Sequence, residues 1–210
     1  KSCASPVDLS APAWQIAGRK VWNWGEKNLH VCDRNTLAKE LLAEPQIATL
    51  IPAMKAMPAE RIAIIGHSFT MDAHWSSPSS FVPIVTTMFE QEHTRVQFRQ
   101  WSAGGLRFAR AYRNYYTETL AWKPNRVLFV LGDSKPEDAE ALKTMAAGFR
   151  AAGVRVLMFD DVEDSIAFGE PTTQETEMIA RKAGVEIIPA RAILDSTPGH
   201  ASFTCMDGIH

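Results

Sequence analysis

The sequence RVLFVLG occupies residues 126–132 and has no charged side chain after its first position. A strand with one buried face alternates apolar and polar residues, whereas a strand that is covered on both faces is apolar throughout. A run of this length, rich in β-branched and aromatic residues and followed by a glycine, is typical of a strand. The segment therefore predicts a buried strand in a parallel sheet that has helices on both faces.

The rest of the chain repeats an alternation of strand and helix. Strand-like runs are expected at residues 61–66, 95–101, 154–160 and 185–190. Apolar residues at helical spacing predict helices at 37–57, 81–92, 106–120, 136–152 and 172–183. This alternation favours a three-layer α/β/α sandwich with a five-stranded parallel sheet, which is a flavodoxin-like architecture.

The composition is that of an ordinary globular protein. Of the 210 residues, 46% are hydrophobic and 22% are charged. The 22 basic and 24 acidic residues nearly cancel, which argues against nucleic acid as a partner. No window approaches the roughly 18 consecutive apolar residues of a membrane-spanning helix. We expect one compact unit, with an N-terminal arm and helix at 1–58 packed on a main domain at 59–210. The oligomeric state stays open.

The first eight residues, KSCASPVD, include no initiator methionine. Either a cleaved signal peptide or a trimmed chain explains this start, and the first explanation predicts a secreted or periplasmic protein. Cys3 and Cys32 either form a disulfide that ties down the N-terminal arm or remain free thiols. With Cys205 they fit no zinc motif.

A serine follows the strand expected at residues 61–66, in the sequence GHSFT. Ser68 would lie at the carboxyl edge of the sheet, which is where open parallel sheets bind their ligands. A serine hydroxyl becomes a useful nucleophile only when a base removes its proton. Unless a histidine reaches it, Ser68 simply caps a turn.

The segment CMDGIH, at residues 205–210, can supply that base. Asp207 and His210 are three residues apart, so a single turn can present both side chains on one side. The carboxylate would then orient the imidazole toward a hydroxyl. The alternative is an acidic residue and a histidine in a surface tail. Because a catalytic histidine at a free terminus would fray, we expect the native chain to continue beyond His210.

The two segments together resemble the SGNH hydrolases, also called the GDSL esterase/lipase family. The first block of that family is Gly-Asp-Ser, often with Thr two residues on, and this chain has Gly66-His67-Ser68-Phe69-Thr70. The last block is Asp-x-x-His, which Asp207 and His210 match. The second block has a glycine after the second strand, and WSAGGLRF at 101–108 supplies Gly104 and Gly105.

The resemblance implies the SGNH hydrolase fold and a serine esterase that acts on a small acyl ester, such as an O-acetyl group on a carbohydrate. Ser68 would be the nucleophile, His210 the general base and Asp207 its orienting partner. Backbone N–H groups of Ser68 and Gly105, with Gly104 as the alternative, would stabilise the oxyanion. No cofactor and no metal is expected.

The chain departs from the family pattern at two blocks. His67 replaces the aspartate of the first block, which alters the hydrogen bonding of that turn. The third block is normally Gly-x-Asn-Asp, but here the segment after Gly132 reads Asp133-Ser134-Lys135. Ser134 would then supply the third oxyanion donor, because an ionised Asp133 only accepts hydrogen bonds. His67 and Asp133 would contact substrate.

Other readings of these residues remain open. Trp75 could stack on a sugar ring or pack in the core. The spacing of His67, Asp72 and His74 is weak as a metal motif. The acidic stretch at 160–170 would disfavour anionic substrates if it lined the cleft. Alternative functions are an O-acyltransferase at the same site, an α/β-hydrolase-type esterase and a non-catalytic binding module on the same scaffold.

Overall fold

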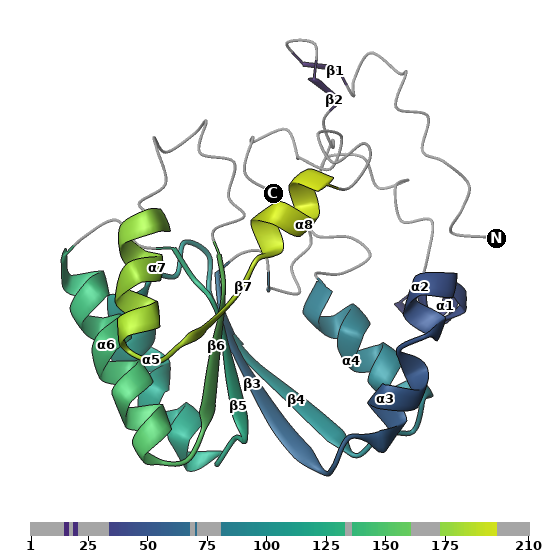
Figure 1. The fold of residues 1–210 in the computed structure, drawn as a ribbon, viewed down its shortest axis with the longest axis horizontal. Coiled ribbons are helices and arrows are strands. Elements are labelled where there is room, and N and C mark those ends of the chain that lie inside the picture. The colour runs from purple at the N-terminus through teal and green to yellow at the C-terminus, as the bar shows by residue number, and fades with distance from the viewer. Residues whose placement is uncertain are drawn as a thin grey trace.

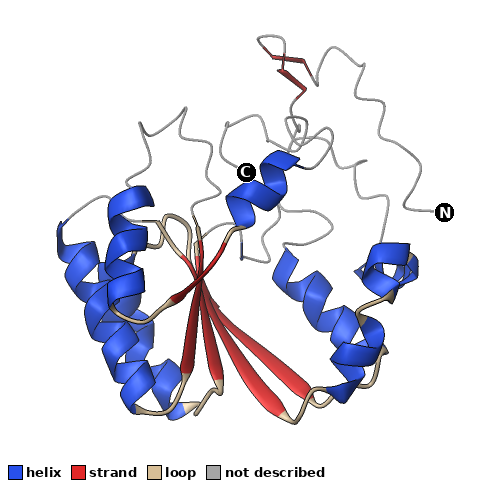
Figure 2. Cartoon of the chain, viewed as in Figure 1, coloured by secondary structure: helices blue, strands red, loops and turns tan. Residues whose placement is uncertain are grey.

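The computed structural model describes residues 15–16, 19–20, 34–67, 70, 81–132, 136–160 and 173–196. A five-stranded parallel sheet forms its centre, with helices on both faces (Figures 1 and 2). Its strands are β3 (Glu60–Gly66), β4 (Val96–Ser102), β5 (Arg126–Val130), β6 (Arg155–Phe159) and β7 (Glu186–Ile188). Their order is β4-β3-β5-β6-β7, so the predicted sandwich is confirmed.

The helices form two groups (Figure 1). One face of the sheet is covered by α5 (Phe108–Ala121), α6 (Pro136–Ala151) and α7 (Thr173–Lys182). On the other side lie α1 (Arg34–Ala43), α2 (Pro45–Ala48), α3 (Ile51–Ala56) and α4 (Phe81–Gln91). The short α8 (Ala190–Ser196) follows β7 and lies beyond the carboxyl edge of the sheet. In the N-terminal arm, β1 (Gln15–Ile16) pairs with β2 (Arg19–Lys20).

The apolar pattern of β5 explains its central place. Val127 and Phe129 belong to the core cluster under α5 and α6, whereas Val130 belongs to the cluster on the opposite face. Both faces of the strand are therefore buried, as its uninterrupted apolar sequence predicts. The helix α6 covers this region with Leu142, Met145 and Phe149, which recur at the spacing of one helical face.

The prediction of one helix over residues 37–57 is wrong, because α1, α2 and α3 occupy this segment. Pro45 has no backbone N–H and disfavours helical dihedrals in the residue before it. Glu44 accordingly has φ −62° and ψ 130°, and Pro45 begins a new helix. The next helix, α3, has Pro52 in its first turn. Across the breaks, Ala38, Leu42 and Met54 still pack with Met88 of α4.

A buried carboxylate joins the amino-terminal ends of α5 and α6. Asp138 lies in the first turn of α6 and is 2% exposed. Its Oδ1 accepts a hydrogen bond of 2.8 Å from the backbone N–H of Ala109, in the first turn of α5. This N–H is one of the donors that a helix cannot satisfy itself. Asp138 therefore fixes the start of α5 relative to the start of α6.

Replacing Asp138 should destabilise the fold through this contact. Asp138→Ala removes the acceptor and leaves the Ala109 N–H buried, so the free energy of unfolding should fall by about 1–3 kcal/mol. Asp138→Asn keeps an oxygen acceptor and should cost less. Urea denaturation measures both, with Glu137→Gln, an exposed residue of the same turn, as the control. Equal losses in Asp138→Asn and Asp138→Ala would contradict this role.

Candidate functional site

The strand order identifies the edge of the sheet where a ligand should bind. From β3 the chain passes through α4 to β4, and from β4 it passes through α5, on the other face, to β5. The direction of winding thus reverses at β3. In open parallel sheets, ligands bind beyond the carboxyl ends of the strands at such a switch point. The candidate site therefore lies where β3 ends, between β4 and β5.

Hydrogen bonds to both neighbouring strands hold the end of β3. The backbone N–H of His67 donates to Val130 O of β5 at 3.0 Å. On the other side, Ala103 N–H donates to Gly66 O at 3.2 Å. The His67 side chain is 4% exposed, so it is packed inside the protein. Residue 68 therefore follows directly from a backbone that is fixed on both sides.

The loop that follows β4 and the loop that follows β5 meet beyond the end of β3. Arg107 forms an isolated parallel bridge with Gly132, although β3 separates β4 from β5 in the sheet. Adjacent strands are about 4.8 Å apart, so the chain at Arg107 has moved one strand spacing toward β5. In the register of the sheet Gly66 pairs with Val130, which places Gly132 two residues past the end of β3. Three segments of the chain thus converge at this point.

A tight turn presents the two glycines that the sequence predicts as oxyanion donors. Leu106 N–H donates to Ala103 O at 3.1 Å, which closes a turn with Gly104 and Gly105 at its centre. Gly105 has φ +58°, a conformation that favours glycine. The turn's own hydrogen bond does not use the N–H groups of Gly104 and Gly105, and both residues are exposed. Because Ala103, the first residue of this turn, donates to Gly66 O, the turn lies beside the end of β3.

The hydroxyl of a buried threonine links the residue after β3 to the end of β4. Thr70 is 0% exposed, and its Oγ1 donates to His67 O at 2.8 Å. The same Oγ1 lies 2.7 Å from Ser102 Oγ at the end of β4. The sequence identified Thr70 as part of the first block but gave no role to Ser102. That role depends on a contact across 32 positions, and no local pattern signals it.

Most of the predicted site residues lie outside the described part of the chain. These are Ser68, Trp75, Asp133, Ser134, Asp207 and His210. Of the predicted site, the structure brings together His67, Gly104 and Gly105, with Gly132 from the third block. Among the described residues, no group of three or more His, Cys, Asp or Glu side chains is placed to hold a metal ion. Asp72 and His74 also fall outside them.

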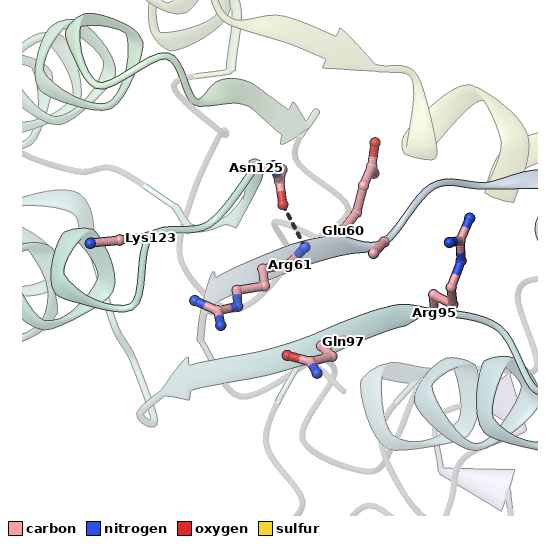
Figure 3. A pocket seen from close by; sticks show the side chains of 7 residues that line it. Glu60, Arg61, Arg95, Gln97, Lys123 and Asn125 are labelled. Atoms are coloured by element: carbon pink, nitrogen blue, oxygen red, sulfur yellow. Dashed lines mark hydrogen bonds between the residues drawn. The ribbon is translucent and has the colours of Figure 1, made fainter.

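A separate hollow lies at the amino ends of the strands and is not part of this site. It is lined by Ala59, Glu60, Arg61, Arg95, Gln97, Lys123 and Asn125. Glu60 is paired with Arg126 at 2.8 Å, and Asn125 Oδ1 accepts a hydrogen bond from the Arg61 backbone N–H. Figure 3 shows that the cationic groups of Arg61 and Arg95 point in different directions. The hollow therefore offers no convergent set of ligand groups.

Comparison with known proteins supports the fold. No protein-family model matches the chain, and no curated protein matches it in sequence. A lipase/acylhydrolase from Enterococcus faecalis has a similar structure, with TM-score 0.57, 18% identity and 72% of this chain and 86% of that chain covered. A catalytic mutant of Axe2, an acetylxylan esterase from Geobacillus stearothermophilus, gives TM-score 0.55, 12% identity and coverage of 69% and 84%. AlinE4, an SGNH-hydrolase family esterase, gives a TM-score of 0.57 and 14% identity, with 73% of this chain and 87% of that chain covered. The fold is thus the α/β/α fold of the SGNH hydrolases, as the sequence resemblance predicts.

The helices in the described part of the chain are too short or too polar to cross a membrane.

Substituting Gly66 should disrupt the packing at the end of β3. A Cβ at Gly66 would overlap the hydroxyl and methyl groups of Thr70 and lie 2.9 Å from its Cβ. Because Thr70 is buried and bonded, it cannot move aside, so Gly66→Ala should lower the free energy of unfolding by about 1–3 kcal/mol. A Cβ at Gly104 would meet nothing within 4 Å, which makes Gly104→Ala the matched control. Urea denaturation that found the two variants equally stable would contradict this packing.

Proposed function

We propose that this protein is a serine esterase that hydrolyses a small acyl ester through an acyl-enzyme on Ser68. Ser68 directly follows His67, whose backbone is bonded to β5. The proposed base is His210, and Asp207 orients it. The roles of these three residues follow from the sequence resemblance. The end of β3 gives the place of the site in the fold.

The convergence beyond β3 is the observation that carries this proposal. Acyl transfer requires N–H donors fixed around the position where negative charge develops. The bridge between Arg107 and Gly132 brings the loops after β4 and β5 to the end of the strand that precedes Ser68. The turn at Gly104 and Gly105 offers two N–H groups there. A nucleophile at residue 68 needs such N–H donors nearby, whereas a serine that only caps a turn does not.

The reaction would proceed in two steps. Ser68 Oγ attacks the ester carbonyl while His210 accepts its proton, which gives a tetrahedral intermediate with a negative oxygen. The N–H groups of Ser68 and Gly105 stabilise this oxygen, with Gly104 as the alternative donor and the Ser134 hydroxyl as the third. His210 then protonates the leaving alcohol, and the C–O bond to the alcohol breaks. In the second step water, deprotonated by His210, attacks the acyl-enzyme and releases the acid and Ser68.

An O-acetyl group on a carbohydrate is the substrate we favour. The structurally similar Axe2 is named as an acetylxylan esterase, and the identity to it is 12%. A tryptophan that follows the nucleophile segment, Trp75, would provide an aromatic face for a sugar ring. Acetylated xylan, compared with 4-nitrophenyl esters of increasing acyl length, tests this preference for a short acyl group.

Variants of the proposed triad should lose ester hydrolysis in a fixed order. Ser68→Ala and His210→Ala should each lower kcat by about 10⁴-fold or more, because they remove the nucleophile and its base. Asp207→Asn should cost less than either, since the carboxylate orients the base but transfers no proton. Hydrolysis of 4-nitrophenyl acetate gives the rates, and circular dichroism verifies that each variant is folded.

A fluorophosphonate probe separates catalysis from mere binding. The protein should react with one equivalent of probe, and Ser68→Ala should abolish the reaction. Ser196→Ala, an exposed serine whose Oγ donates to Ile193 O in α8, should label as the unsubstituted protein does. Folded protein that hydrolyses no ester and takes up no probe would overturn the proposal in favour of a binding module.

A further inference from the structure

Arg107 places a guanidinium group beside the candidate reaction centre. Its Nη1 lies 3.5 Å from the position that a Cβ on Gly132 would occupy. Gly132 is two residues beyond Val130, the partner of Gly66, so it lies roughly 7 Å past the level at which β3 ends. This point lies beyond the carboxyl end of β3, beside the candidate site. A Cβ at Gly132 would be in ordinary van der Waals contact with this guanidinium, so the two residues are direct neighbours.

Within the described part of the chain, the positive charge of Arg107 has no negative partner. Among the described residues, no carboxylate forms an ion pair with Arg107 and no side chain is hydrogen-bonded to its guanidinium. The nearby carboxylate of Asp138 is buried and accepts the Ala109 N–H. Arg107 itself is half-buried. An arginine in this position is available to an anion that comes from solution.

A second arginine borders the same turn. Arg107 is the N-cap of α5, and Arg110 lies in the first turn of the same helix. The Nη1 of Arg110 lies 3.4 Å from Gly104 O. The turn that carries the proposed oxyanion donors is therefore in contact with a second guanidinium group.

We propose that Arg107, assisted by Arg110, selects ester substrates that carry a carboxylate near the reacting carbonyl. This assignment rests on the proposed esterase function. In an O-acetyl substrate the acetyl group carries no charge, so the carboxylate would belong to the sugar; in a longer acyl group such as succinyl it belongs to the acyl chain. A guanidinium matches a carboxylate through two parallel hydrogen bonds, which gives direction as well as affinity. Partial burial strengthens the attraction, because solvent screens the charges less than it does at an exposed site.

A matched pair of esters tests the selection. The substrates are 4-nitrophenyl butyrate and the monoanion 4-nitrophenyl succinate, which are similar in size and differ by a terminal carboxylate. The carboxylate of the succinate also attacks its own ester and releases 4-nitrophenolate without protein, so this rate is measured separately and subtracted. After the subtraction the protein should have the higher kcat/KM for the succinate, and Arg107→Met should lower the succinate-to-butyrate ratio by about tenfold or more. Arg107→Lys keeps the charge but cannot form the two parallel hydrogen bonds, so it should give an intermediate ratio. The preference should also weaken as the ionic strength rises.

The control is Arg113→Met, which removes an exposed arginine of the same helix about 9 Å further from the sheet edge. Its ratio should equal that of the unsubstituted protein. A preference for butyrate, as an acidic cleft would produce, overturns the proposal. An equal loss for both esters in Arg107→Met also overturns it, since that result indicates a structural role or contact with the oxyanion.

Binding to the Ser68→Ala variant separates this proposal from the esterase function. Calorimetric titration with the two esters should give tighter binding of the succinate, and adding Arg107→Met should remove the difference. This readout needs no turnover. A charge preference without hydrolysis by the unsubstituted protein would sustain the Arg107 assignment and refute the esterase. Equal binding of both esters would refute the Arg107 assignment, whatever the activity.

Discussion

The fixed end of β3 is the constraint on which the candidate site depends. His67 N–H bonds to Val130 O on one side, and Gly66 O accepts from Ala103 N–H on the other. The strand therefore stops with its last residues held by both neighbours. A catalytic site needs such preorganised backbone, because groups that are already in place cost no reorganisation when the substrate reacts.

The surrounding residues make this constraint possible. Gly66 has no side chain, so Thr70 can lie directly over it and bond to both His67 O and Ser102 Oγ. The bond between Asp138 and Ala109 fixes where α5 begins, and the turn at Gly105 leads directly into that helix. The loops after β4 and β5 are thus positioned by contacts with the core. Arg107 is held at their meeting point, which gives the site a positive charge.

The sequence predicts the central strands well because β3 and β5 are buried along most of their length. The apolar run at 126–132 and the shorter run before Gly66 have no alternative place in a globular fold, and glycines mark where helices end. The single helix expected at 37–57 fails because Pro45 and Pro52 divide an otherwise helical pattern of apolar residues. The roles of Ser102, Arg107 and Asp138 could not be predicted. Each residue contacts a partner that is about 25–32 positions away in the sequence. The partners are Thr70 for Ser102, Gly132 for Arg107 and Ala109 for Asp138. The proposed triad residues lie outside the described part of the chain and remain predictions.

The central claim is that acyl transfer takes place where β3 ends, between the loops that follow β4 and β5. A crystal structure of the protein after reaction with a fluorophosphonate tests it most directly. The account predicts phosphorus bonded to Ser68 Oγ, with the phosphoryl oxygen within about 3 Å of the Gly105 N–H. An adduct on another residue, or a phosphoryl oxygen that faces away from both loops, would contradict it.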